Sequence, residues 1–188
     1  MLVLASASPR RQELLRHAGI PFAVQSADIP EELRRGEMPK AFAERLAQEK
    51  AAAVLPYRPN DFVLGADTIV TVDDQILGKP KNAEDGIRML GMLSGRSHQV
   101  ITGVCLTGAE RESFVDVRSE TTIVTMVEFS GEDIRSYVAS GEPLNKAGAY
   151  AIQGGASRWI SRIEGDYFNV VGLPVSLVYR MLREHGVI

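Results

Sequence analysis

The sequence has 188 residues and only one cysteine, Cys105, which lies in the apolar run "VITGVCLTG". A single cysteine forms no intramolecular disulfide, and without a second thiol it makes no soft-metal site. The three histidines are scattered, and no two of them stand at a metal-ligand spacing. We therefore expect Cys105 to be a buried core thiol and any bound metal to use oxygen ligands.

A basic excess and long apolar runs are also missing. The net charge of −3 disfavours a surface that coats nucleic acid. The opening "MLVLASASPRR" has no basic leader, and its apolar run is too short for a signal peptide or a membrane span. We expect a cytoplasmic protein with a small-molecule partner, without nucleic acid or membrane, and a homodimer as the default assembly.

The motif GxxxxGK[ST] does not occur, which excludes a P-loop kinase or ATPase, and GxGxxG is missing as well. There is no internal repeat or linker-like tract, and a 45% hydrophobic composition suits one substantial core. We predict a single domain over residues 1–188. Strands and helices alternate early and strands pair late, which favours an α/β fold with a mixed sheet flanked by helices.

Hydrophobic periodicity and cap residues place the individual elements. The two long strands in the middle of the chain are expected to pair antiparallel through the turn at 108–113, and a hairpin is expected at Asp73 and Asp74. Between the fourth and fifth helices we expect a strand, a glycine loop and a second strand. The predicted strands lie at 1–5, 21–32, 62–72, 98–108 and 117–129, and the predicted helices begin near Pro9, Pro39, Asn82, Ser130 and Pro174.

The first helix carries unexpected charges. Ser8 is a good N-cap and Pro9 suits the first helical position, yet Arg10 and Arg11 occupy the first turn. Free N–H groups and the positive end of the helix dipole favour an anion there. The helix that starts after Asn82 has two acidic residues in its first turn, as the rule requires. The arginine pair therefore predicts a small anionic partner.

Asp67 is the strongest single candidate for chemistry. Its carboxylate lies inside the apolar stretch "VLGADTIV", where desolvation opposes charge unless a cation or donor compensates. This favours a general base or a metal ligand, and a turn residue bonded to nearby N–H groups stays an equal alternative. A magnesium or manganese ion held by Asp67, by Glu31 or Glu49, and by a substrate phosphate fits the available oxygen ligands.

Three further side chains each have a functional and an ordinary interpretation. Lys50 lies on or beside the apolar stripe of the helix at 39–55, where it either serves a site or extends its charge into water. Lys79, with Lys81, suits phosphate binding in the loop "GKPK", or else belongs to a solvated loop. The amide of Gln153 can pair with the edge of a uracil or thymine base, or with its own loop.

Seven short motifs follow one another over nearly the whole chain. They are "SASPRR" at 6–11, "LAQEKA" at 46–51, "GADTIV" at 65–70, "GKP" at 78–80, "LSGRSHQVITGV" at 93–104, "KAGAYAIQG" at 146–154 and "NVVGLP" at 169–174. Any one of them is weak, and the ordered set is hard to obtain by chance. Together they resemble the Maf (septum formation protein) family of nucleoside triphosphate pyrophosphatases.

The resemblance implies a two-lobed α/β protein of the Maf/ITPase type with a central mixed sheet and an active-site cleft. It implies hydrolysis of a nucleoside triphosphate to the monophosphate and pyrophosphate with a divalent cation, and the "GAYAIQG" form resembles the dTTP- and UTP-directed branch. That branch often has aspartate where this sequence has Asn145. Action on another nucleotide such as methylated GTP, or a role as a cell-division regulator without catalysis, stays open, as does a link to cell-division arrest and to removal of modified nucleotides.

The resemblance also assigns roles to individual residues. Asp67 matches the proton acceptor. Apart from the resemblance, we expect Asp67 and Glu31 to be the metal ligands. Ser8 and Arg11 are expected to support substrate binding beside the specificity residues. The set implied by the family is Asp67, Glu31, Lys50 and Lys79 for catalysis, and Arg10, Thr68 and Gln153 for substrate choice.

Overall fold

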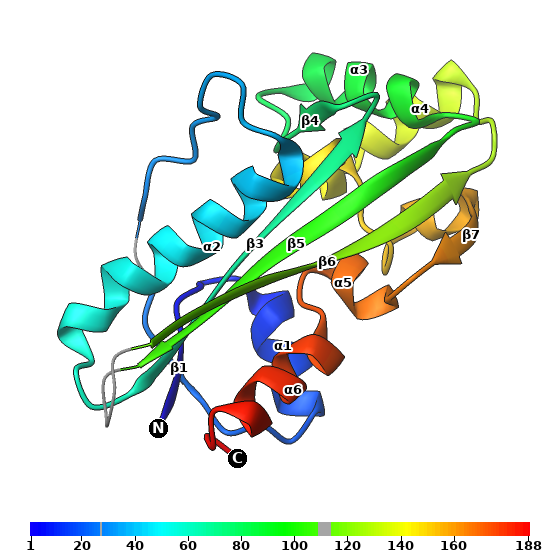
Figure 1. The fold of residues 1–188 in the computed structure, drawn as a ribbon. Coiled ribbons are helices and arrows are strands. Elements are labelled where there is room, and N and C mark those ends of the chain that lie inside the picture. The colour runs from blue at the N-terminus through cyan, green and yellow to red at the C-terminus, as the bar shows by residue number, and fades with distance from the viewer. Residues whose placement is uncertain (27, 109–113) are drawn as a thin grey trace. The chain divides into compact units, whose positions relative to one another are not determined.

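The computed structural model describes residues 1–26, 28–108 and 114–188, and within them it forms a mixed seven-stranded sheet with six α-helices (Figure 1). The predicted α/β class is confirmed. The strands are β1 (Leu2–Leu4), β2 (Ala23–Val24), β3 (Phe62–Val72), β4 (Gln75–Leu77), β5 (Ser97–Gly108), β6 (Phe114–Met126) and β7 (Ile160–Glu164). The helices are α1 (Pro9–His17), α2 (Pro39–Val54), α3 (Ala83–Leu93), α4 (Gly131–Ala139), α5 (Tyr167–Val171) and α6 (Val175–Glu184).

The strand order is β2-β1-β3-β5-β6-β7, with β4 paired to β3. β1 runs parallel to both β2 and β3, whereas β4 is antiparallel to β3 and β7 is antiparallel to β6. The predicted turn that follows β5 falls on residues 109–113, which lie outside the described residues. No helix in the described part of the chain is long and apolar enough to cross a membrane.

The chain divides into two compact units. The first unit contains 1–68, 102–120 and 172–188, and the second contains 69–101 and 121–171. β3, β5 and β6 contribute residues to both units, because the boundaries fall inside these strands.

In the first unit, α2 lies directly on the backbone of two strands. A Cβ atom added at Gly65 of β3 would be 2.1 Å from the carbonyl oxygen of Ala47, and one added at Gly103 of β5 would be 2.2 Å from that of Ala43. Glycine is therefore required at both strand positions for this approach. The small side chains of α2 complete the contact, and Ala47 and Ala51 are fully buried.

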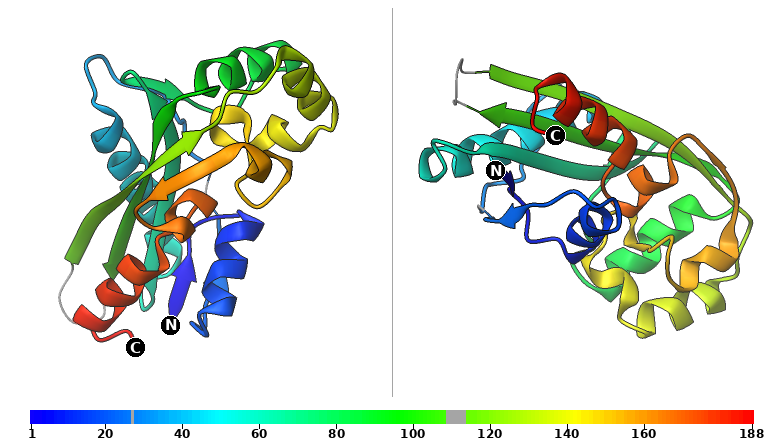
Figure 2. Two further views of the ribbon diagram at one scale, coloured as in Figure 1. Left: turned by 90° about the vertical axis from the view of Figure 1, so that its right-hand side faces the viewer. Right: turned by 90° about the horizontal axis from the view of Figure 1, so that it is seen from below.

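α1 and α6 cover the side of this unit's strands opposite α2 (Figures 1 and 2). Leu14 and Leu15 are the buried apolar residues of α1. α6 has an apolar stripe at helical spacing, which explains why it forms a helix here. Its buried residues are Leu177, Val178, Met181 and Leu182.

The second unit confirms the predicted caps and the hairpin. Asn82 caps α3 through the backbone N–H of Asp85, and Ser130 with Asp133 forms a capping box on α4. Asp73 and Asp74 have φ of +49° and +59°, the left-handed conformation that a two-residue hairpin turn requires.

The strand expected before the glycine loop is wrong. Residues 142–145 and 147–149 form short 3-10 turns, and residues 152–154 form a further turn. The reason is local, because Gly148 and Ala149 have φ of +68° and +58°, and two consecutive left-handed residues cannot continue a strand. A Cβ at Gly148 would lie 2.9 Å from the side chain of Val70.

We predict that Gly65→Ala lowers the free energy of unfolding by about 1–3 kcal/mol or more, because the new methyl group has no space against α2. The matched control is Gly91→Ala on α3, where no atom lies within 4 Å of the added Cβ, so helix propensity should stabilise it by up to about 1 kcal/mol. Urea denaturation of both variants checks this, and equal free energies of unfolding would contradict the close approach.

Candidate active site

The pleat of β3 directs successive side chains to opposite faces. Val63, Gly65 and Asp67 share the face that α2 covers, and Thr68 belongs to the other face. Asp67 is 7% exposed, so its carboxylate is largely removed from water. A buried carboxylate requires a cation or several donors.

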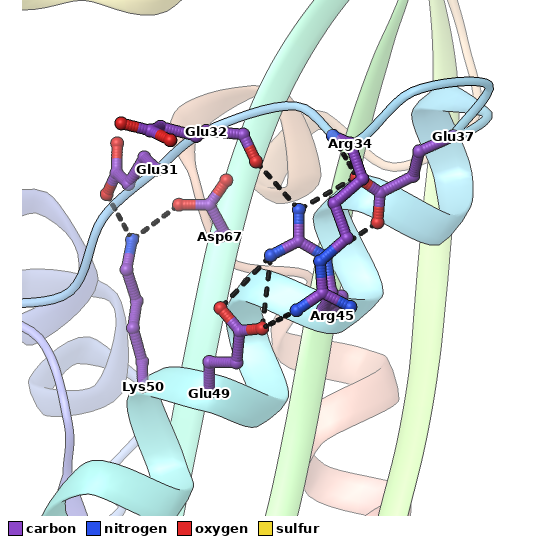
Figure 3. A network of polar contacts seen from close by, with 8 residues as sticks. All are labelled: Glu31, Glu32, Arg34, Glu37, Arg45, Glu49, Lys50 and Asp67. Carbon is purple, nitrogen blue, oxygen red and sulfur yellow. Dashed lines mark hydrogen bonds and ion pairs between the residues drawn. The ribbon is translucent and has the colours of Figure 1, made fainter.

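Lys50 of α2 supplies that cation (Figure 3). Its Nζ lies 2.5 Å from Oδ1 of Asp67 and 2.6 Å from Oε1 of Glu31. The Lys50 side chain is 12% exposed, so its ammonium does not extend into water as the ordinary interpretation proposed. Three residues distant in the sequence are thus brought together, with the ammonium between two carboxylates.

Glu31 reaches this position from the segment 28–38, which has no helix or strand. Its side chain is 44% exposed, in contrast to that of Asp67. Glu49, the alternative metal ligand, accepts instead from Arg45 and Arg34 at 2.9–3.1 Å. Glu31 is therefore the acidic residue that the structure places beside Lys50.

The carboxylates of Asp67 and Glu31 match a hard divalent cation in number, but no third acidic side chain joins them among the described residues. Magnesium is commonly held by one or two carboxylates together with substrate phosphate oxygens, and Asp67 with Glu31 provides such a pair. In the described part of the chain, no group of three or more His, Cys, Asp or Glu side chains is arranged to hold a metal ion. Asp67 and Glu31 are therefore the two residues that could hold such a cation together with phosphate oxygens.

Arg11, on the other face of β3, is nearly buried and bonds to neutral oxygens. Its Nε donates to the carbonyl oxygen of Gly172 at 2.8 Å, and its two terminal nitrogens donate to the hydroxyls of Ser6 and Thr68 at 3.0 Å each. Burial lowers the pKa of Arg11, and the negative charges of Asp67 and Glu31 oppose that shift. Arg11 therefore holds the β1–α1 junction against β3 while keeping a poorly neutralised charge.

The hydroxyl of Thr68 belongs to the same network. It accepts from Arg11, lies 2.9 Å from the hydroxyl of Thr102, and is 3.2 Å from the carbonyl oxygen of Gly172. Thr68 is thus bonded mainly to protein groups.

Arg10 and Ser8 stand at the start of α1. Ser8 is the N-cap residue, as predicted, but its side chain makes no capping hydrogen bond among the described residues. Burial lowers the pKa of Arg10, and its side chain is partly exposed. Of the two first-turn arginines, Arg11 meets protein acceptors, and Arg10 is the better candidate for an external anion.

Lys79 and Gln153 belong to the second unit, and both are exposed. Lys79 lies in the loop between β4 and α3, as predicted. Gln153 lies in the turn 152–154, in the region where a strand was expected before the glycine loop.

Glu142 fixes the turn that contains Gln153, a role that no sequence pattern predicted. Its carboxylate accepts from the backbone N–H of Gly155 at 3.1 Å and from the hydroxyl of Tyr137 at 2.6 Å. The Tyr137 oxygen in turn accepts from the N–H of Ala151 at 3.1 Å. Both ends of the turn are therefore attached to one carboxylate–phenol pair.

Asn145, where the resemblance to the dTTP- and UTP-directed branch implies aspartate, accepts from Nζ of Lys146 at 2.8 Å. Nζ of Lys146 also donates to the carbonyl oxygen of Glu142 at 2.9 Å. The amide oxygen of Asn145 therefore retains a lysine contact that a carboxylate would strengthen.

The fold is of the class seen in the Staphylococcus aureus Ham1 protein, with a TM-score of 0.51, 16% identity and 98% of each chain covered. A family model described as Maf-like protein matches residues 1–185. The chain therefore belongs to the Maf-like protein family, and the resemblance seen in the seven motifs is confirmed.

Three similar curated proteins share one name. A protein of Koribacter versatilis called dTTP/UTP pyrophosphatase is 57% identical over 187 residues, covering 100% of this chain and 95% of its own length. Proteins with the same name from Symbiobacterium thermophilum and Geobacter sp. strain M21 are 51% and 52% identical, each covering 98% of this chain and 94% and 95% of their own lengths.

We predict that Arg11→Lys lowers the free energy of unfolding by about 1–3 kcal/mol, because one ammonium cannot reach three separated acceptors and leaves buried oxygens unpaired. Arg16→Lys on the same helix is the control, since Arg16 is exposed, donates one hydrogen bond to Gln12 and otherwise lies over the ring of Phe22, where a lysine can also lie. Chemical denaturation compares the two, and an equal loss in both variants would contradict the role of the guanidinium fork.

Proposed function

We propose that this protein hydrolyses dTTP and UTP to the nucleoside monophosphate and pyrophosphate. The observation that carries the proposal is the array of Asp67, Lys50 and Glu31, with Nζ of Lys50 within 2.6 Å of both carboxylates. The shared name of relatives 51–57% identical over nearly the whole chain supports the substrate class.

In the proposed reaction, Asp67 is the proton acceptor. Lys50 bonds to its Oδ1, and we assign Oδ2 to the attacking water. As Oδ2 takes the proton, the water oxygen forms a bond to the α-phosphorus and the bond to the α,β-bridging oxygen breaks. Pyrophosphate leaves with the bonding electron pair. General base catalysis of this kind contributes about 10²- to 10⁴-fold to a rate.

Lys50 has two roles in this proposal. It compensates the charge of buried Asp67 before substrate arrives, and it is a mobile cation that can bind a phosphate oxygen. Phosphoryl chemistry depends mainly on positioning and on charge stabilisation. The two carboxylates keep the Lys50 ammonium in position, where it can bind a phosphate oxygen of the triphosphate. Arg10 and Lys79 are the further cations we assign to the phosphates, with Ser8 and Arg11 in support.

We further propose that Mg²⁺ or Mn²⁺ takes part, held by Asp67, Glu31 and the substrate phosphates. The bound cation would withdraw negative charge from the pyrophosphate leaving group. A cytoplasmic location also fits the proposal, because the lone cysteine is buried and unpaired with any other thiol.

We predict that Asp67→Asn lowers kcat by about 10²-fold or more with little loss of stability, because the amide keeps the shape but cannot accept the proton. The measurement is release of monophosphate and pyrophosphate from dTTP and UTP, with and without Mg²⁺ or Mn²⁺. Pyrophosphate release at the wild-type rate would contradict the assignment, and diphosphate with orthophosphate as products would move the attack to another phosphorus.

We predict that Gln153→Ala and Arg10→Ala chiefly change substrate preference and KM. Loss of an amide that reads the base should reduce the ratio of kcat/KM for UTP over CTP by about 10-fold or more. The panel consists of the common triphosphates and methylated GTP, and Gln75→Ala in β4 is the control, since its side chain is also exposed. An unchanged profile in Gln153→Ala would contradict base reading by that amide.

A further inference from the structure

Residues 28–38, which include Glu31, keep a defined conformation only through contacts with other parts of the protein. Residues 28–38 form no helix or strand, and most of them are exposed. Fixing each such residue in one conformation costs about 1–2 kcal/mol of conformational entropy. A carboxylate on this segment can keep a defined place beside Lys50 only if other contacts hold the chain.

Arg45 of α2 makes those contacts (Figure 3). Its Nε and one terminal nitrogen donate to the two oxygens of Glu37 at 2.6 and 2.8 Å, and the same terminal nitrogen donates to the carbonyl oxygen of Glu32 at 2.9 Å. The fork on Glu37 is bidentate, which fixes orientation as well as distance. The Arg45 side chain is 15% exposed, so solvent screens these bonds weakly.

Glu49 holds the guanidinium from the helix side. The other terminal nitrogen of Arg45 is 3.1 Å from both oxygens of Glu49, four residues further along α2. Glu49 also accepts from Arg34 at 2.9 Å, and the N–H of Arg34 donates to Glu37 at 3.0 Å. These hydrogen bonds form a closed network that holds residues 32–37 against one face of α2.

One helix thus holds two consecutive residues of the segment. Lys50 bonds to the carboxylate of Glu31, and Arg45 bonds to the carbonyl oxygen of Glu32. Because α2 is rigid and rests on Gly65 and Gly103, both contacts share one frame with Asp67. We propose that Arg45 is a positioning residue that acts through the Glu32–Glu37 backbone to hold the Glu31 carboxylate on Lys50.

Charge strengthens this anchor over a wide pH range. The bonds from Arg45 lower the pKa of Glu37 to about 2 and raise the pKa of Arg45 itself. Both partners therefore stay ionised at any pH at which the enzyme would be assayed. Arg45 does not contact the proposed reacting atoms, so its influence must pass through Glu31.

The proposal rests on the proposed pyrophosphatase reaction, and its test has one arm that does not need activity. Arg45→Gln is compared with Arg88→Gln, which removes an exposed arginine bonded to Asp85 on α3. Hydrogen–deuterium exchange should become faster in 28–38 for Arg45→Gln, while exchange in β3 stays as in the wild type. Unchanged exchange in 28–38 overturns the anchor, whatever the activity of the protein.

The second arm is a double-mutant cycle with Glu31→Gln, measured as pyrophosphate release from dTTP. Arg45→Gln should lower kcat by about 10- to 100-fold with a smaller change in KM, because a shift of about 1 Å in a site group can cost that much. In the Glu31→Gln background the same substitution should have little further effect. An equal loss in both backgrounds overturns action through Glu31.

Two more variants keep the test decisive. Arg45→Lys retains the positive charge but not the bidentate guanidinium. Its kcat and its exchange rate in 28–38 should lie between those of the wild type and Arg45→Gln. Glu37→Gln leaves the guanidinium on Glu32 and Glu49 and replaces Arg45→Gln in both arms if that variant does not fold. If the wild type releases no pyrophosphate from any triphosphate, the proposed function fails, and the exchange arm alone then decides whether Arg45 anchors the segment.

Discussion

The close approach of α2 to β3 and β5 is the constraint on which the proposed site depends. It exists because Gly65 and Gly103 have no side chains, so that carbonyl oxygens of α2 occupy the space of the missing methyl groups. Gly65 lies two residues before Asp67 on the same face of β3, and the contacting Ala47 lies one turn before Lys50. The glycine that admits the helix therefore also determines the distance between the carboxylate and the ammonium.

The pleat of β3 then directs the adjacent residues Asp67 and Thr68 into two separate polar clusters, one on each face of the strand. Asp67 faces α2 and joins Lys50 and Glu31, whereas Thr68 bonds to Arg11 on the other face. A shift of one residue in the register of β3 would exchange these partners and leave Asp67 without its cation. The parallel pairing of β1 with β3 at Leu2–Leu4 fixes that register, and the same short strand leads into the helix that carries Arg11.

Local sequence patterns predicted most of the elements, because strands such as 62–72 and the capped helices after Asn82 and Ser130 carry their signals within a few residues. The strand predicted at 21–32 was too long, since only Ala23–Val24 forms β2 and 28–38 has no helix or strand. The sequence patterns also singled out Asp67, a carboxylate among apolar neighbours. They could not choose between the two interpretations of Lys50, since helical period places a side chain on a face but does not name its partner. Arg45 and Glu142 were missed for the same reason, because each binds a segment that has no periodicity of its own.

The charges of the first unit support the proposed triphosphate substrate. Arg10, Arg11 and Lys50 are three cations, and Asp67 and Glu31 are the two carboxylates that Lys50 joins. Arg11 hydrogen-bonds to a carbonyl and two hydroxyls, and such dipoles orient a guanidinium without cancelling its charge. A carboxylate in their place would neutralise Arg11 and weaken its attraction for an anion. The neutral acceptors thus preserve a positive potential near the N-terminus of α1, where the helix dipole adds to it.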